Sequence, residues 1–166
     1  SQPERVAAVY SDMLVVDADG NPMIGSFLAR MLNGAAPPQG ELFSRILAGN
    51  FLPAPAVMVR RSAIAAVGGY DESLVYEDLD MWLRLSLMGS IVSLAEPLAS
   101  YREHSSSGTA AMVASGKNGR DELRVIDHVL CGAPKALAPV RLRREAINRA
   151  AHRTWCWAEE ACRAGH

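Results

Sequence analysis

Apolar residues along this chain fall into short segments separated by polar, glycine-rich or proline-rich stretches. Short apolar segments bounded by turn formers predict strands over 6–16, 54–60, 91–94 and 98–102. The apolar centre of 54–60 further predicts that this strand is buried. Apolar residues at helical spacing predict helices over 24–32, 41–48, 62–67, 78–88, 118–130 and 141–163. Mixed strands and helices followed by a helical tail indicate an α/β or α+β fold.

The last predicted helix carries a stripe of small and apolar residues that suits close helix packing, so we expect its role to be structural. The stripe consists of Leu142, Ala146, Ile147, Ala150, Trp157, Ala158 and Ala161. His152 and Cys156 lie four residues apart on the same helix, as two metal ligands would. No further ligands accompany them, so a core or surface position is favoured.

Composition narrows the class of protein. The chain has 166 residues, of which 49% are hydrophobic and 21% charged, which fits one folded domain. A net charge of −1 gives no electrostatic reason to expect nucleic acid or an anionic membrane surface as partner. The 3 cysteines lack C-x-x-C spacing, and no secretory signal or long apolar run is visible. These features predict a cytoplasmic protein, free or attached peripherally to the inner membrane.

The most informative stretch is a glycine pair, Gly68-Gly69, followed by the acidic pair Glu77-Asp78 at the start of a predicted helix. Adjacent glycines let the backbone adopt positive φ and approach a ligand closely. A carboxylate fixed beside such a turn suits a general base, and Asp78 is the first candidate. The alternative is that Asp78 is only a helix N-cap. Glu77 either assists Asp78 or complements the helix dipole.

Residues around this stretch have alternative roles. Gly69 and the segment Tyr70-Asp71-Glu72 predict either a lip that binds an acceptor sugar or a helix end followed by a type I turn. Asp80 and Arg84 are spaced to form an ion pair on one helix, which we expect to be mainly structural. Trp82 is expected in the core.

Two further segments carry candidate ligands. Arg102 and His104 alternate along the end of a predicted strand, so both side chains should point to one face. There they would bind a diphosphate, with His104 as a candidate metal ligand, or form an ordinary solvated pair. Asp17 and Asp19 form a D-x-D sequence that could bind Mg²⁺ or Mn²⁺ on a diphosphate. The following Gly20-Asn21-Pro22 favours a hairpin turn instead.

Taken in order, these motifs resemble the second half of a family 2 glycosyltransferase domain of the GT-A fold. The resemblance covers about residues 6–107. It rests on Tyr10-Ser11-Asp12, Asp17-Ala18-Asp19-Gly20, Asn50-Phe51-Leu52-Pro53, Val57-Met58-Val59-Arg60-Arg61-Ser62, Val67-Gly68-Gly69-Tyr70-Asp71-Glu72, Glu77-Asp78-Leu79-Asp80-Met81-Trp82-Leu83-Arg84-Leu85, Gly89, Glu96-Pro97-Leu98 and Tyr101-Arg102-Glu103-His104.

The resemblance implies an α/β fold with a partial GT-A-like mixed sheet flanked by helices. It also implies an inverting enzyme that transfers a sugar from a nucleotide diphosphate sugar to a glycan or another hydroxyl acceptor. The position that matches the family's base is Asp78. Gly68, Gly69, Tyr70, Asp71 and Glu72 would bind the acceptor, and Arg102 and His104 the donor diphosphate. The family's nucleotide site and D-x-D lie upstream of the matching region, so we expect this chain to be part of a longer protein.

We therefore expect residues 1–107 to be the acceptor-side half of a glycosyltransferase domain and residues 108–166 a helical extension. A divalent metal, Mg²⁺ or Mn²⁺, would belong to the full-length enzyme and would not bind tightly here. The isolated chain is expected to be inactive without the N-terminal half, and a homo-oligomer is an open option. The alternative is a non-catalytic module that keeps the fold for interaction or regulation.

Overall fold

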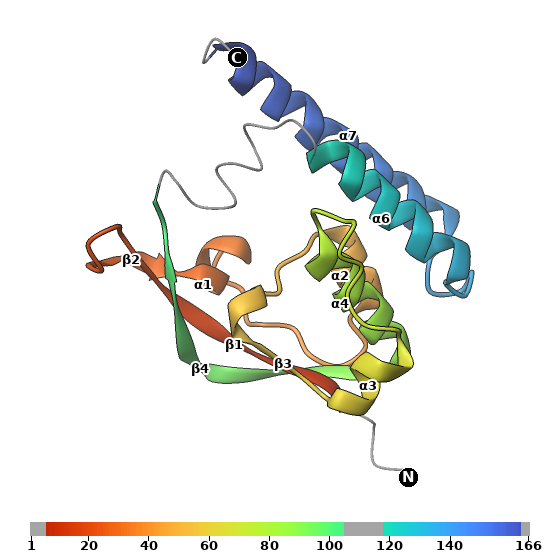
Figure 1. Cartoon of the computed structure of the whole chain (residues 1–166), viewed down its shortest axis with the longest axis horizontal. Helices are drawn as coiled ribbons and strands as arrows, with labels where there is room; N and C mark the ends of the chain where they lie inside the picture. Colours follow the sequence, from red (N-terminus) through yellow and green to blue (C-terminus); the bar gives the residue numbers. More distant parts are fainter. Residues whose placement is uncertain (1–5, 105–117, 164–166) are drawn as a thin grey trace.

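A computed structural model describes residues 6–104 and 118–163, shown in Figure 1. The strands are β1 Val6–Val16, β2 Pro22–Ser26, β3 Val57–Val59 and β4 Ser90–Arg102. The α-helices are α1 Phe27–Met31, α2 Phe43–Ala48, α3 Arg61–Ala66, α4 Glu77–Met88, α6 Asn118–Gly132 and α7 Val140–Arg163. A 3₁₀ turn, η1 Ala54–Ala56, precedes β3.

The sheet is built around β1. Strand β4 pairs with β1 in parallel along its whole length, from Val6 opposite Ser90 to Val16 opposite Arg102. Strands β2 and β3 both pair with β1 antiparallel. Strand β2 pairs with the end of β1 and β3 with a part near the start of β1, so both lie along the edge of β1 opposite β4. A mixed sheet flanked by helices confirms the predicted α/β class.

The prediction of a helix over 24–32 is wrong for the first part of this segment. Residues Pro22–Ser26 form β2, and only Phe27–Met31 is helical. Gly25 has φ of 80°, which interrupts a right-handed helix. The short helix that remains begins at Ser26, whose hydroxyl accepts a hydrogen bond from the Ala29 N–H. A carboxylate oxygen of Asp12 accepts from the Leu28 N–H at 2.9 Å, which ties this helix to β1.

Two strand predictions are also corrected. The segments 91–94 and 98–102 belong to one strand, β4, whose register with β1 shifts around Pro97. Proline has no N–H to donate to a ladder, so it is tolerated at such an irregularity. Strand β3 is not buried as expected, because it lies at the sheet edge and Met58 is 78% exposed.

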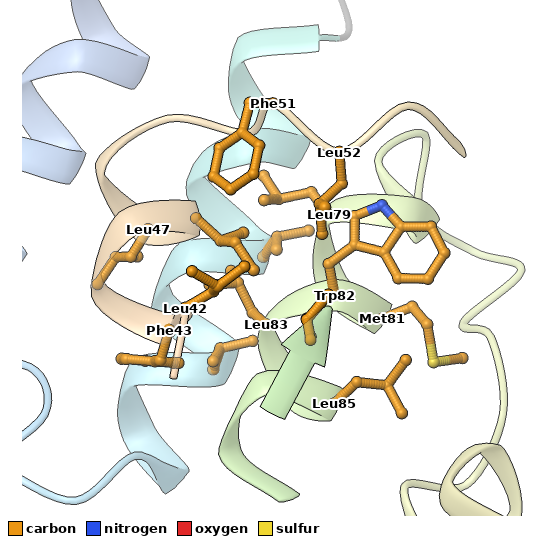
Figure 2. Close-up of a cluster of buried hydrophobic side chains, with 14 of the residues drawn as sticks. Leu42, Phe43, Leu47, Phe51, Leu52, Leu79, Met81, Trp82, Leu83 and Leu85 are labelled. Atoms are coloured by element: carbon orange, nitrogen blue, oxygen red, sulfur yellow. The ribbon is translucent and has the colours of Figure 1, made fainter. Parts of the chain in front are cut away.

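The core lies between the sheet and helices α2 and α4. Figure 2 shows the cluster that α4 contributes, Leu79, Met81, Trp82, Leu83 and Leu85, with Leu42, Phe43, Leu47, Phe51 and Leu52 around it. Trp82 is 1% exposed, so its predicted core position is confirmed. Helix α4 ends at Gly89, as the glycine predicts.

Helices α6 and α7 form a hairpin that packs on this core, α6 against α4 and α7 against α2 (Figure 1). Ala146 and Ala150 of α7 are fully buried, which the predicted stripe requires. Ile147 is 46% exposed, so its assignment to the stripe is wrong. The side chains of Trp157, Ala158 and Ala161 lie outside the described residues, as does the predicted boundary at 107–108.

No helix within residues 6–104 and 118–163 is long and apolar enough to cross a membrane.

Candidate functional site

The N-terminal turn of α4 holds the two acidic residues singled out in the sequence. The helix begins at Glu77, and its N-cap is Tyr76, which makes no side-chain capping bond. Asp78 is therefore the second residue of the helix and not its N-cap. One carboxylate oxygen of Asp78 accepts a hydrogen bond from the Leu79 N–H at 2.6 Å. This bond fixes the carboxylate against the exposed N–H groups of the first turn.

Asp78 is half-buried, and its pKa is raised above the ordinary value. Burial raises its pKa above the ordinary value, the bond from the Leu79 N–H lowers it, and the neighbouring charge of Glu77 raises it. In the described part of the chain, no ion pair or basic side-chain partner offsets the burial of this carboxylate. A half-buried carboxylate with a raised pKa and no cationic partner is well suited to accept a proton.

The glycine pair forms the turn that follows α3. Gly68 and Gly69 have φ of 84° and 81°, in the region that favours glycine. A Cβ at either position would meet nothing within 4 Å, so the turn faces open space. The positive φ explains the two glycines, and their N–H groups donate within the protein, to the Ala65 and Ile64 carbonyls.

Arg84 holds this turn against α4. Its guanidinium donates to the Gly69 carbonyl at 2.9 Å and to the Val67 carbonyl, and it pairs with Asp80. The Asp80 carboxylate is fully buried, and the Nδ1 atom of His128 on α6 lies 3.3 Å from its other oxygen. The predicted Asp80–Arg84 pair is confirmed, and it links the glycine turn, α4 and α6.

Tyr70 stands next to the two acidic residues. Its ring meets Trp82 edge to face, with centroids 6.4 Å apart, and the residue is still 46% exposed. Burial raises the pKa of the Tyr70 hydroxyl, and the charges of Asp78 and Glu77 raise it further, which places all three groups near one another. The structure thus brings Asp78, Glu77 and Tyr70 together, and the glycine turn, which precedes Tyr70, is bonded to α4 at Arg84.

Asp71 and Glu72 follow at the surface. One oxygen of Asp71 accepts from the Ser73 hydroxyl at 2.7 Å and from the Ser73 N–H at 3.0 Å. These bonds lower the pKa of Asp71. Asp71 therefore shapes the turn itself, and Glu72 is exposed beside it.

Arg102 and His104 lie at a different place. The Arg102 guanidinium donates to the Ala18 carbonyl at 2.8 Å, so it is engaged with the turn between β1 and β2. Figure 1 shows this hairpin apart from α4, at the other end of the sheet. Among the described residues no hydrogen bond or ion pair joins Arg102 to Asp78. His104 is exposed just after β4.

The D-x-D segment forms the hairpin turn favoured by its sequence. One oxygen of Asp17 accepts from the N–H groups of Asp19 and Asn21, at 2.9 and 2.8 Å, and the other accepts from the Asn21 amide at 3.0 Å. No group of three or more His, Cys, Asp or Glu side chains within 6–104 and 118–163 is arranged to hold a metal. His104 therefore belongs to no such group there, and neither does the His152–Cys156 pair.

A polar cluster beside Asp78 was not predicted. Glu122 of α6 is 4% exposed, pairs with Arg153 of α7 at 3.6 Å, and its other oxygen lacks a hydrogen-bond partner among the described residues. Burial and the charge of Glu122 raise the pKa of Tyr76 to about 12, with a smaller contribution from Asp78. Only the packing of α6 and α7 on α4 brings these side chains together, and no local sequence signal indicates that packing.

The sequence matches no protein-family model and no curated protein. The site must therefore be interpreted from its own geometry.

Proposed function

We propose that this chain forms the acceptor side of an inverting glycosyltransferase in which Asp78 is the general base. The observation that carries the proposal is the environment of Asp78. Its carboxylate is half-buried, lacks a cationic partner among the described residues, and has a raised pKa close to the half-exposed Tyr70. A raised pKa makes a carboxylate a stronger base for a hydroxyl proton.

In the proposed step, an oxygen of Asp78 takes the proton from an acceptor hydroxyl as that hydroxyl attacks the anomeric carbon of the donor sugar. The new bond from oxygen to carbon forms on the face opposite the leaving group, which inverts the configuration. The bond from the anomeric carbon to the diphosphate breaks, and the nucleotide diphosphate leaves with the electron pair. Asp78 ends protonated and returns the proton to solvent.

The acceptor would lie over the surface formed by Tyr70 and the glycine turn. A half-exposed tyrosine offers an apolar ring face and a hydroxyl, the combination that binds a sugar. Arg84 holds the turn rigidly through the Gly69 carbonyl, which pre-organises that surface. Glu77 assists by raising the pKa of Asp78, and Asp71 and Glu72 form the rim.

A nucleotide-sugar donor and a divalent metal belong to this proposal for the complete enzyme. The described residues do not provide a metal site, so we assign no step to the metal and place its ligands elsewhere. Arg102 and His104 lie by the β1–β2 turn, apart from α4 (Figure 1), so the step on Asp78 requires the donor diphosphate to be held by residues outside those described.

The hydrogen bond from Arg102 to the Ala18 carbonyl favours a second candidate function, a non-catalytic module that keeps the fold for interaction with another protein. In such a module the arginine only stabilises the β1–β2 turn, and Asp78 contributes no chemistry.

Turnover of the intact protein separates the two candidates. Asp78→Asn should reduce transfer from a panel of UDP- and GDP-sugars by about 10²-fold or more, because the base is lost. The matched control is Asp127→Asn, which removes an exposed carboxylate from α6 and should leave transfer unchanged. Full activity of Asp78→Asn, or no transfer by the wild-type protein from any donor, would favour the interaction module.

A further inference from the structure

A second site lies on the opposite end of α4 from Asp78. A cavity of about 400 Å³ opens where the last turn of α4 meets α2, the start of β4 and the loop between α6 and α7. This volume falls within the range of small-molecule sites in proteins. Nothing in the glycosyl-transfer chemistry proposed above uses it.

The walls of this cavity are braced by hydrogen bonds between segments distant in sequence. Gly40 and Ile91 exchange two backbone hydrogen bonds, of 2.8 and 2.9 Å, which hold Glu41 beside the start of β4. The Ser44 hydroxyl of α2 donates to the Leu137 carbonyl at 3.0 Å. Because both sides are tied, the cavity is formed before any ligand enters.

Two of the three hydroxyls that line the cavity, those of Ser44 and Ser86, already donate within the protein and present lone pairs. Glu41 is its one charged lining residue, and this exposed carboxylate forms no ion pair with the described residues. The Ser86 hydroxyl already donates to the Leu83 carbonyl at 2.7 Å, so it presents lone pairs. The last turn of α4 contains no basic residue, so its own side chains do not offset the negative end of the helix dipole.

The remaining surface is apolar, with one buried hydroxyl. Phe43 lines the inner wall, and Met88 and Leu137 stand at the mouth, 51% and 37% exposed. Ser90 is 9% exposed, and its hydroxyl has no hydrogen-bond partner among the described residues. Because Glu41 is the charged residue of the lining and the rest is mainly apolar, the cavity favours a ligand that combines positive charge with a short apolar body.

We propose that this cavity binds a small primary ammonium ion with a short alkyl chain. The ammonium group would lie between the Glu41 carboxylate and the carbonyl end of α4, where its three N–H donors meet acceptors. The alkyl chain would cover Phe43, Met88 and Leu137. This site is independent of the proposed glycosyl transfer, so either proposal can fail without the other.

Titration of the 166-residue chain with three probes of equal length tests this proposal. The probes are n-butylammonium, 1-butanol and butyrate, followed by amide chemical shifts in two-dimensional NMR. Butylammonium should shift the signals of Glu41, Ser86 and Ser90 in a saturable manner. Butanol and butyrate should not, because they lack the positive charge.

Variants sharpen the result. Glu41→Gln keeps the size of the side chain and should weaken butylammonium binding roughly tenfold, because a charge-assisted bond is lost. Glu41→Lys should abolish binding. The matched control, Glu96→Gln, removes an exposed carboxylate from β4 and should bind as the wild type does. Equal shifts from butanol, the absence of saturable shifts, or unchanged binding by Glu41→Gln would overturn the proposal.

Discussion

At the scale of single residues, Arg84 is the side chain on which the candidate site most depends. It neutralises a fully buried carboxylate, Asp80, and donates to the backbone of the glycine turn. Arg84→Ala should lower the free energy of unfolding by about 3–5 kcal/mol, because it leaves a buried charge without its main partner. Urea unfolding at constant pH measures this loss.

The matched control for that prediction is Arg141→Ala. Arg141 also pairs with a carboxylate four residues away, Glu145, but its side chain is 85% exposed. Its removal should change stability little, since exposed pairs are solvated and screened. If Arg84→Ala is no more destabilising than Arg141→Ala, then His128, at 3.3 Å from Asp80, is a sufficient partner.

Asp78 makes a second prediction at this scale, concerning pH. Burial raises its pKa above the ordinary value of 3.8. At a pH between the ordinary pKa, which applies to the unfolded chain, and the raised pKa of the folded chain, Asp78 holds a proton in the folded chain that it has released in the unfolded chain. The free energy of unfolding therefore falls as pH rises through this interval, and it remains lower above it.

Asp78→Asn has no carboxyl group to titrate at this position, so its free energy of unfolding does not fall in this way. Its stability relative to the wild type should therefore increase as pH rises from about 3 to 7. Urea unfolding of both proteins at several pH values measures the difference. A variant that is both more stable and inactive is what a functional, strained position predicts. A stability difference that stays constant with pH would show that Asp78 is not disfavoured as a charge.

At the scale of elements, the packing of α7 rests on two small residues. Ala146 and Ala150 are fully buried and let the helix approach α6 and α2 closely. Ala150→Leu should lower the free energy of unfolding by about 1–3 kcal/mol, because the added methyl groups have no space. The same change at the neighbouring exposed residue, Ala151→Leu, should have little effect. Thermal unfolding compares them, and equal melting temperatures would contradict this packing.

Removal of residues 141–166 is a harsher test of the same element. The deletion should lower the melting temperature or cause aggregation, because it would expose apolar residues of α2 and α6 such as Leu47, Ile126 and Leu130. Size-exclusion chromatography and thermal unfolding measure the outcome. A soluble truncated chain of unchanged stability would show that α7 does not stabilise the body of the protein.

Elements with their own local signal were predictable from the sequence. Strand β1 has the predicted bounds, and α4 begins one residue before the prediction, because an apolar stripe and the terminal Gly89 define it locally. Residues 24–26 were predicted as helix but belong to β2, because this strand takes its conformation from pairing with β1, which is a contact between separate segments. The same cause makes β4 continuous across Pro97.

In the candidate site, too, only the residues that lie close together in sequence could be predicted to be neighbours. The neighbourhood of Asp78, Tyr70 and the glycine turn follows from residues close in sequence. Glu122 and Arg153 could not be predicted there, because α6 and α7 reach the start of α4 only through tertiary packing. Strand alternation could not indicate that Arg102 donates to carbonyls of the β1–β2 turn, since the turn is distant in sequence.

At the scale of the whole molecule, the β1–β2 turn decides whether the described part of the chain can bind a nucleotide sugar through a metal. Asp17 would have to serve as a metal ligand if this chain bound a nucleotide sugar at its D-x-D segment. Both of its oxygens already accept hydrogen bonds within the turn, and the bond from the Asn21 side chain is the main cause of its lowered pKa. The Arg102 guanidinium also lies against the Ala18 carbonyl, and its positive charge disfavours a second cation there.

We therefore expect the 166-residue chain to bind UDP- and GDP-sugars poorly, even with Mn²⁺ present. Calorimetric titration should show no binding in the micromolar range, because a metal would first have to displace the hydrogen bonds of the turn. Asp19→Asn serves as the companion variant, since Asp19 contributes only its N–H to the Asp17 carboxylate. Micromolar binding that requires Mn²⁺ and is lost in Asp19→Asn would mean that the turn rearranges into a donor site. In that case the donor would lie away from Asp78, and Asp78 could not be the base of the proposed transfer.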